Sequence, residues 1–186
     1  MYTTTRHGVC VNVIQEDILN RPCDVLVTTA NPGFQLTGGI GAQLMARLGF
    51  SYQGEVNKMA QLEFGSSPAP PGSILVTGAF GMACDHIIHA VGIDVFYKTH
   101  QDVLAGLTRR VIESSVKLGA RHLAMPAFAT GYGRYPMDEA ARAMASGLEV
   151  LHEGAGDLTV IDICLKSKHR YDAYVKAFQA SSIAGQ

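Results

Sequence analysis

Two glycine-rich loops are the parts of this sequence best suited to chemistry. Residues 30–42 read ANPGFQLTGGIGA and residues 129–136 read ATGYGRYP, and each follows a segment that reads as a strand and precedes one that reads as a helix. Glycine lets backbone N–H groups approach an anion closely, and the N-terminus of a following helix adds partial positive charge. Because open α/β sheets bind ligands at the carboxyl ends of their strands, the two loops together predict a site for two phosphate groups. For either loop alone, tight turns would explain the glycines equally well.

Other nucleotide and catalytic signatures are missing from the chain. The first predicted strand runs into Gln15-Glu16-Asp17 without a GxGxxG pattern, and neither GxxxxGK[ST] nor GxSxG occurs. These absences disfavour a nicotinamide-type Rossmann site, a P-loop NTPase and an α/β-hydrolase. No metal-ligand spacing joins the four cysteines, which we interpret as reduced core residues: Cys10, Cys23, Cys84 and Cys164. We expect neither a metal nor a cofactor.

The elements that must position the loops alternate between strands and helices. Six segments read as strands, several of them continuous apolar runs typical of strands covered on both faces: residues 8–14, 24–30, 73–79, 86–92, 122–127 and 158–165. Apolar residues at helical spacing predict helices over 99–118, from 136 to about 152, and around 171–178, with one or two more over 40–62 broken at Gly49. Thr99 and Asp102 are spaced as a capping box for the helix over 99–118.

The connection between the third and fourth predicted strands fixes their relative direction. Only six residues separate Ala79 from His86. A parallel crossover needs about a dozen residues or more. We therefore predict that these two strands pair antiparallel within an otherwise mostly parallel sheet.

Length and charge predict one folded domain and exclude several kinds of partner. The 186 residues include 47% apolar types and 17% charged types, which favours a single domain over 1–186 with 181–186 as a frayed tail. With 15 basic and 16 acidic side chains the net charge is −1, which argues against non-specific nucleic-acid binding. No apolar run approaches the roughly 18–20 residues that cross a bilayer, and the first residues do not resemble a signal peptide. We expect a cytoplasmic protein with no membrane partner.

Five segments in order along the chain resemble the macrodomain family, the ADP-ribose-binding modules also called Appr-1″-p processing domains. The second segment stands where the family commonly has VNAAN, the fourth matches its IHAVG strand, and the fifth matches its second phosphate loop. The segments are Glu16-Asp17-Ile18, Val27-Thr28-Thr29-Ala30-Asn31, Gly38-Gly39-Ile40-Gly41-Ala42, Ile87-Ile88-His89-Ala90-Val91-Gly92 and Pro126-Ala127-Phe128-Ala129-Thr130-Gly131-Tyr132-Gly133. Each piece is weak alone, but the ordered set covers almost the whole chain and is specific.

The resemblance implies a three-layer α/β/α fold with a six-stranded mixed, mostly parallel sheet. It also implies binding of ADP-ribose, free or attached to a protein or nucleic acid. Asp17 would accept a hydrogen bond from the adenine amine with the Ile18 amide near the base, and Asn31 would hold the distal ribose and position water as the one catalytic candidate. The diphosphate would lie between Gly38, Gly39, Ile40 and Gly41 on one side and Thr130, Gly131, Tyr132 and Gly133 on the other. From the residues alone, Asp17 could instead cap a helix or turn, and Asn31 could form an Asx turn before Pro32.

The departures from the family concern catalysis. Family members that hydrolyse ADP-ribosyl esters commonly carry an aspartate where this chain has Gly41, and often an aromatic residue where it has Gly133. An active hydrolase of ADP-ribosyl or O-acetyl-ADP-ribose bonds, or an ADP-ribose-1″-phosphate phosphatase, stays an alternative if a positioned water suffices. A binding module for another nucleotide is the second alternative.

Three further side chains have both a structural and a functional interpretation. His89 could act as a general base, but we interpret it as a structural histidine of a core strand. Arg134 could reach a phosphate or be solvated. Tyr135, like Tyr132, could cover the ligand or pack in a core.

Overall fold

Seven strands form one mixed sheet at the centre of the fold. The computed structural model describes residues 1–183, the last three by their backbone only. The strands are β1 (Tyr2–Arg6), β2 (Val9–Ile14), β3 (Val25–Ala30), β4 (Ile74–Gly78), β5 (His86–Val91), β6 (His122–Pro126) and β7 (Val160–Cys164), in the spatial order β1-β2-β7-β6-β3-β5-β4. The outer pairs β1–β2 and β4–β5 are antiparallel and the other neighbours are parallel. The predicted antiparallel pairing of β4 with β5 is therefore confirmed.

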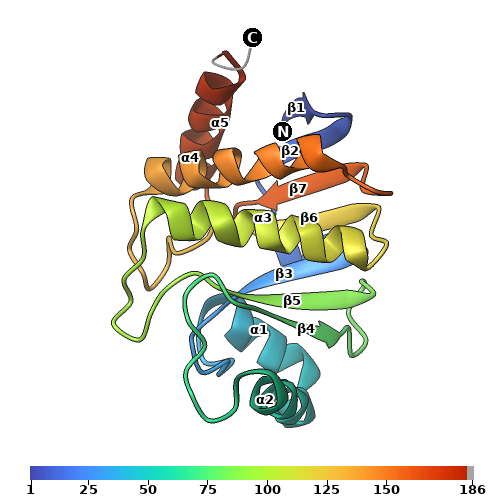
Figure 1. Ribbon diagram of the computed structural model, residues 1–186, viewed down its shortest axis with the longest axis vertical. Coiled ribbons are helices and arrows are strands. Elements are labelled where there is room, and N and C mark those ends of the chain that lie inside the picture. Colours follow the sequence, from blue (N-terminus) through green and yellow to red (C-terminus); the bar gives the residue numbers. More distant parts are fainter. Residues whose placement is uncertain (184–186) are drawn as a thin grey trace.

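Helices cover both faces of the sheet and complete the three-layer α/β/α architecture. They are α1 (Gly39–Leu48), α2 (Phe50–Phe64), α3 (Gln101–Lys117), α4 (Met137–Gly147) and α5 (Lys168–Ile183), with short 3-10 helices η1 (Ile18–Asn20) and η2 (Leu148–Glu153). One core cluster joins the sheet to α3, α4 and α5, and a second joins the opposite face to α1, α2 and η1. Figure 1 shows α3 and α4 crossing in front of the sheet, with α1 and α2 near its β4 edge. Among residues 1–183, no helix has the length and apolar character needed to span a membrane.

The sheet has seven strands, so the expectation of six was wrong by one. The additional strand is β1, which carries three consecutive threonines and alternates between half-buried and exposed residues. An edge strand with few apolar side chains gives no apolar run to detect. β1 reaches β2 through a tight turn at His7 and Gly8, both with positive φ (48° and 85°), as in a type I′ hairpin loop. The strand predicted from Gly8 accordingly begins at Val9.

The helix boundaries follow glycine and proline but not the predicted capping box. Gly49, with φ of 78°, ends α1 and precedes α2, which confirms the predicted break. Thr99 does not cap α3: the N-cap is His100, without a side-chain hydrogen bond, so that prediction was wrong. Pro136 is the N-cap of α4, and its acidic neighbours Asp138 and Glu139 lie in the first turn, where the helix dipole favours them. α5 continues to Ile183, into the segment expected as a tail, while residues 184–186 lie outside the described part of the chain.

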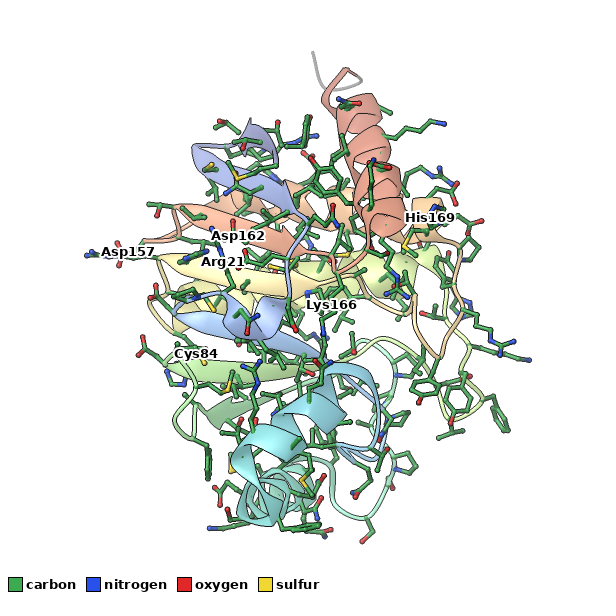
Figure 2. The ribbon with its side chains drawn as sticks, turned by 180° about the vertical axis from the view of Figure 1, so that it is seen from behind. Arg21, Cys84, Asp157, Asp162, Lys166 and His169 are labelled. Carbon is green, nitrogen blue, oxygen red and sulfur yellow. The ribbon has the colours of Figure 1, made fainter. Side chains whose placement is uncertain are left out.

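A buried carboxylate ties β7 to its neighbours. Asp162 is completely buried in β7 and accepts hydrogen bonds from Asn12 Nδ2 on β2 at 2.8 Å, from Arg21 Nε at 2.6 Å and from His122 Nε2 on β6 at 2.6 Å. Figure 2 shows Arg21 beside Asp162. Burial raises the pKa of the Asp162 carboxyl, but the bonds from His122, Asn12 and Arg21 outweigh it, so the pKa lies below its ordinary value. Asp162 is therefore a charged anchor inside the sheet.

Candidate functional site

A cavity opens where the strands β3, β5, β6 and β7 end. Its volume is about 460 Å³, within the range of roughly 300–1,000 Å³ typical of small-molecule sites. Both glycine-rich loops line it, the first leading from β3 to α1 and the second from β6 to α4. Ten predicted ligand residues belong to its lining: Asp17, Ile18, Asn31, Gly38, Gly39, Ile40, Thr130, Gly131, Tyr132 and Gly133.

Gly41 is the predicted ligand residue that lies outside this lining. It is buried in the first turn of α1, where a methyl group would stand 3.3 Å from Cα of Leu36. A side chain at this position would therefore make a tight contact with the Leu36 backbone. The chain at Leu36 is fixed in turn, because its N–H donates to Gln53 Oε1 at 2.8 Å.

Asn31 organises the first loop through its side chain. Its Oδ1 accepts from the N–H groups of Gly33 and Gln35, both at 3.1 Å, and its Nδ2 donates to the carbonyl of Gln35 at 2.6 Å. This is the Asx-type arrangement that the sequence left open as an alternative. A neutral amide has two N–H donors, so one remains for a ligand. The predicted contact of Asn31 with a distal ribose would use that second hydrogen.

The second loop faces the first through Tyr132. The tyrosine ring lies against Gly38, and it also meets the ring of Tyr97, with 6.4 Å between the two centroids. Gly133 has no room for any side chain: a methyl group there would lie 2.7 Å from the carbonyl oxygen of Ala129 and 2.8 Å from Cγ2 of Ile93. An aromatic residue cannot replace Gly133 without rebuilding the loop. Tyr132 is therefore the aromatic side chain that this loop contributes to the cavity.

Asp17 lies at another part of the cavity wall, in an ion pair. Its Oδ1 accepts from the N–H of Leu19 at 3.2 Å as the N-cap of η1, and its Oδ2 lies 2.7 Å from Nζ of Lys166. Burial raises the pKa of this carboxyl, but the hydrogen bonds from Lys166 and Leu19 outweigh it, and the pKa falls below its ordinary value. Asp17 is thus an ionised hydrogen-bond acceptor at neutral pH. The capping contact uses Oδ1 and the ion pair uses Oδ2, so each oxygen keeps a lone pair for a further hydrogen bond.

Among the lining residues that the sequence did not identify are Tyr97, Lys166 and Arg170. Lys166 follows directly after the last predicted strand, so the rule that strand ends carry the site could have found it. Arg170, in α5, donates from Nη2 to the carbonyl of Thr130 at 3.3 Å and supports the second loop. Tyr97 lies in a loop with positive φ (62°), where no sequence pattern marked it.

His89 is structural, as predicted. It is fully buried in β5, and its Nε2 lies 2.9 Å from the Tyr52 hydroxyl and 3.2 Å from the Thr77 hydroxyl. Burial lowers its pKa to about 4, so the ring is neutral at pH 7. His89 is not part of the cavity wall. Arg134, which is exposed, and Tyr135, which packs against the core, also lie outside the wall.

The carboxylates in the wall of the cavity are paired with cations. Within residues 1–183, Glu16 and Asp17 are the carboxylates that line it, and each pairs with a cation: Glu16 with Arg21 at 3.6 Å and Asp17 with Lys166. No histidine belongs to the wall described for these residues. The same part of the chain contains no cluster of three side chains able to hold a metal ion, and its four cysteines are free thiols.

The fold and the cavity define a class of protein, an α/β/α domain with a cavity between two glycine-rich loops at its strand ends. The model of the Macro domain family matches residues 27–144, and the chain therefore belongs to that family. It is 28% identical over 174 residues to an uncharacterized protein of Saccharolobus solfataricus, covering 94% of this chain and 95% of that one. It is also 27% identical over 176 residues to an uncharacterized protein of Mycobacterium bovis, covering 95% of this chain but only 46% of the longer relative.

A solved structure gives the same fold. The macrodomain of Oceanobacillus iheyensis, in a mutant form with ADPR, superposes with a TM-score of 0.89 at 21% identity, covering 98% of both chains. This likeness confirms the macrodomain fold that the sequence resemblance implied.

Proposed function

We propose that this protein binds ADP-ribose, free or attached to a protein or nucleic acid, in the cavity between its two glycine-rich loops. The observation that carries the proposal is that both loops, Asp17 and Asn31 line one cavity at the strand ends of a macrodomain fold. The Oceanobacillus iheyensis relative in complex with ADPR supports the choice of ligand.

The proposed arrangement assigns each part of the ligand to its own chemistry. Asp17 accepts a hydrogen bond from the adenine amine, for which an ionised carboxylate is suited. Backbone N–H groups of residues 38–40 and 130–133 bind the diphosphate from opposite sides, the first set helped by the N-terminus of α1. The free N–H of Asn31 donates to the distal ribose, and Tyr132 covers that end of the ligand.

Binding without fast hydrolysis is the activity that this wall favours. The position where family hydrolases commonly carry an aspartate is Gly41, buried against Leu36; of the two carboxylates in the described wall, Glu16 pairs with Arg21 and Asp17 is assigned to the adenine amine. General base catalysis needs a free acceptor within hydrogen-bond reach of the attacking water.

Calorimetric titration with ADP-ribose tests the proposal, with AMP and NAD as competing ligands. We expect one-to-one binding with a micromolar or tighter dissociation constant, and much weaker binding of AMP because it lacks the distal ribose. Arg170→Ala removes the support of the Thr130 carbonyl and should weaken binding, whereas the exposed Arg134→Ala is the matched control. Absence of heat at several temperatures, or equal binding of AMP, would contradict the proposal.

A second measurement separates binding from hydrolysis. The protein is incubated with an ADP-ribosylated protein, and free ADP-ribose is followed by chromatography. We expect retention of the modified protein without release. Release that disappears in Asn31→Ala, with the fold intact, would instead assign the protein to the hydrolases.

A further inference from the structure

Three side chains from three elements meet at the Asp17 part of the cavity. Lys166 follows β7, Asp17 caps η1, and Gln43 belongs to α1; all three line the cavity. The Lys166 Nζ atom lies 2.7 Å from Asp17 Oδ2 and donates to Gln43 Oε1 at 2.8 Å. In Figure 2, Lys166 reaches from the end of β7 toward the start of α1. The Lys166 ammonium thus lies beside Asp17, the carboxylate proposed to bind the adenine base.

Both partners have hydrogen-bonding capacity left after these contacts. A lysine ammonium has three N–H donors, and two are used by Asp17 and Gln43. An ionised carboxylate has about four lone-pair sites, and Asp17 uses one for Leu19 and one for Lys166. The side chains remain accessible, with 55% of Lys166 and 22% of Asp17 exposed. The cavity wall therefore presents a donor and an acceptor side by side.

Purines differ at position 6 in whether they donate or accept a hydrogen bond, and a paired donor and acceptor can recognise this difference. Adenine carries an amine donor there, whereas hypoxanthine and guanine carry a carbonyl acceptor, and lysine commonly donates to that oxygen. A carboxylate alone would attract the adenine amine and repel the carbonyl. With an ammonium beside it, a 6-oxopurine can accept from Lys166 through O6 and donate its N1–H to Asp17.

We propose that the cavity accepts 6-oxopurine diphosphate ribosides as well as ADP-ribose, with Lys166 as the residue that determines this specificity. The inference rests on the proposed function, because it assigns the base to the Asp17 part of the same cavity. Lys166 enables recognition of O6, while adenine needs only Asp17 and the nearby backbone.

Inosine diphosphate ribose, which carries hypoxanthine, is the probe that tests this inference. Its dissociation constant is measured by calorimetry beside that of ADP-ribose, for the unmodified protein, Lys166→Met and Lys168→Met. Lys168 is the matched control because its side chain is 76% exposed, pairs with Asp172 and is not part of the cavity wall. Thermal unfolding followed by circular dichroism verifies that each variant is folded.

The unmodified protein should bind the two ligands within about tenfold of each other. Lys166→Met should weaken inosine diphosphate ribose by at least about tenfold and change ADP-ribose by less than about threefold, and Lys168→Met should change neither. Binding of ADP-ribose alone by the unmodified protein, or an equal loss of both ligands in Lys166→Met, overturns the inference while the proposed function stands. Failure of both ligands to bind the unmodified protein overturns the proposed function itself.

Discussion

The ring of Tyr132 packs on Gly38 so closely that a methyl group at Gly38 would lie 2.6 Å from Cε2 of the tyrosine. The three nearest atoms to that methyl all belong to Tyr132. The two glycine-rich loops thus touch through one aromatic side chain. Gly38 has φ of −148°, which any residue can adopt, so its lack of a side chain serves this contact and not the backbone.

A double-mutant cycle tests whether this contact shapes the site. Gly38→Ala should displace the Tyr132 ring and weaken ADP-ribose binding, whereas in the Tyr132→Ala background the same change should have no effect within about twofold. The coupling free energy should be about 1 kcal/mol, measured by calorimetry on the four proteins. Gly54→Ala, in α2 with no atom close to the added methyl, is the control. An equal loss in both backgrounds would show that Gly38 acts independently of Tyr132.

Asp17→Ala should weaken ADP-ribose binding by about 1–3 kcal/mol, the usual loss for a charged hydrogen-bond partner. Since the pKa of Asp17 lies below its ordinary value, this contribution should persist at neutral pH and disappear only as the pH falls through that lowered pKa. Calorimetry at neutral and acidic pH measures both effects. Asp172→Ala removes the equivalent surface partner of Lys168 and should leave binding unchanged. An unchanged dissociation constant for Asp17→Ala would remove it from the site.

Asp162→Asn should destabilise the fold by about 3 kcal/mol in urea unfolding at neutral pH, because Arg21 and His122 lose a charged partner. This loss of stability is at the low end for buried ion pairs, because the side chains of Arg21 and His122 are 31% and 25% exposed. The pKa of Asp162 is lowered, so its stabilisation is present above the ordinary aspartate pKa and is lost as the pH falls through the folded value.

Asp157→Asn is the control for this substitution, since it removes a carboxylate that is exposed, as Figure 2 shows, near the start of the same strand. It should leave the unfolding free energy within about 0.5 kcal/mol of the unmodified protein. If Asp162→Asn were equally mild, the buried network would contribute little to stability.

His89 should cause a loss of stability at a higher pH than Asp162 does. Its pKa of about 4 in the folded protein is below that of an unfolded histidine, so the unfolded chain binds the proton first. Stability should fall by about 3 kcal/mol as the pH drops from about 6.5 to about 4. His89→Gln, which retains a polar partner for Tyr52 and Thr77, should flatten this region of the pH profile of urea unfolding. An unchanged slope would mean that His89 does not cause it.

The strand ends, and with them the two loops, could be predicted from the sequence because apolar runs and glycine patterns are local. The hydrogen-bond and ion-pair partners of the side chains could not be predicted from the sequence. Asn12 and Asp162 are 150 positions apart, and the partner of a long side chain such as Lys166 depends on which elements the fold brings within its reach. The edge strand β1 was not predicted, because its threonines pair with β2 through the backbone without forming an apolar run.

The alternatives at Asn31 show a different limit. The sequence allowed either an Asx turn or a ligand contact, and the hydrogen bonds of the amide establish the first while leaving one donor for the second. Gly41 could be recognised as a departure from the family, but its burial against Leu36 depends on the path of the preceding loop, which no local pattern specifies.

The hydrogen bonds of Asp162 also fix the register of β7 against its neighbours β2 and β6. Asp162 stands level with Asn12 on one side and Ala124 on the other, and Lys166 emerges four residues later. Side chains alternate between faces, so a shift of one residue would turn the carboxylate toward the apolar cluster under α3 and α4 and carry Lys166 away from Asp17. The buried Asp162 carboxylate thereby sets the register of β7, and with it the position of Lys166 in the cavity.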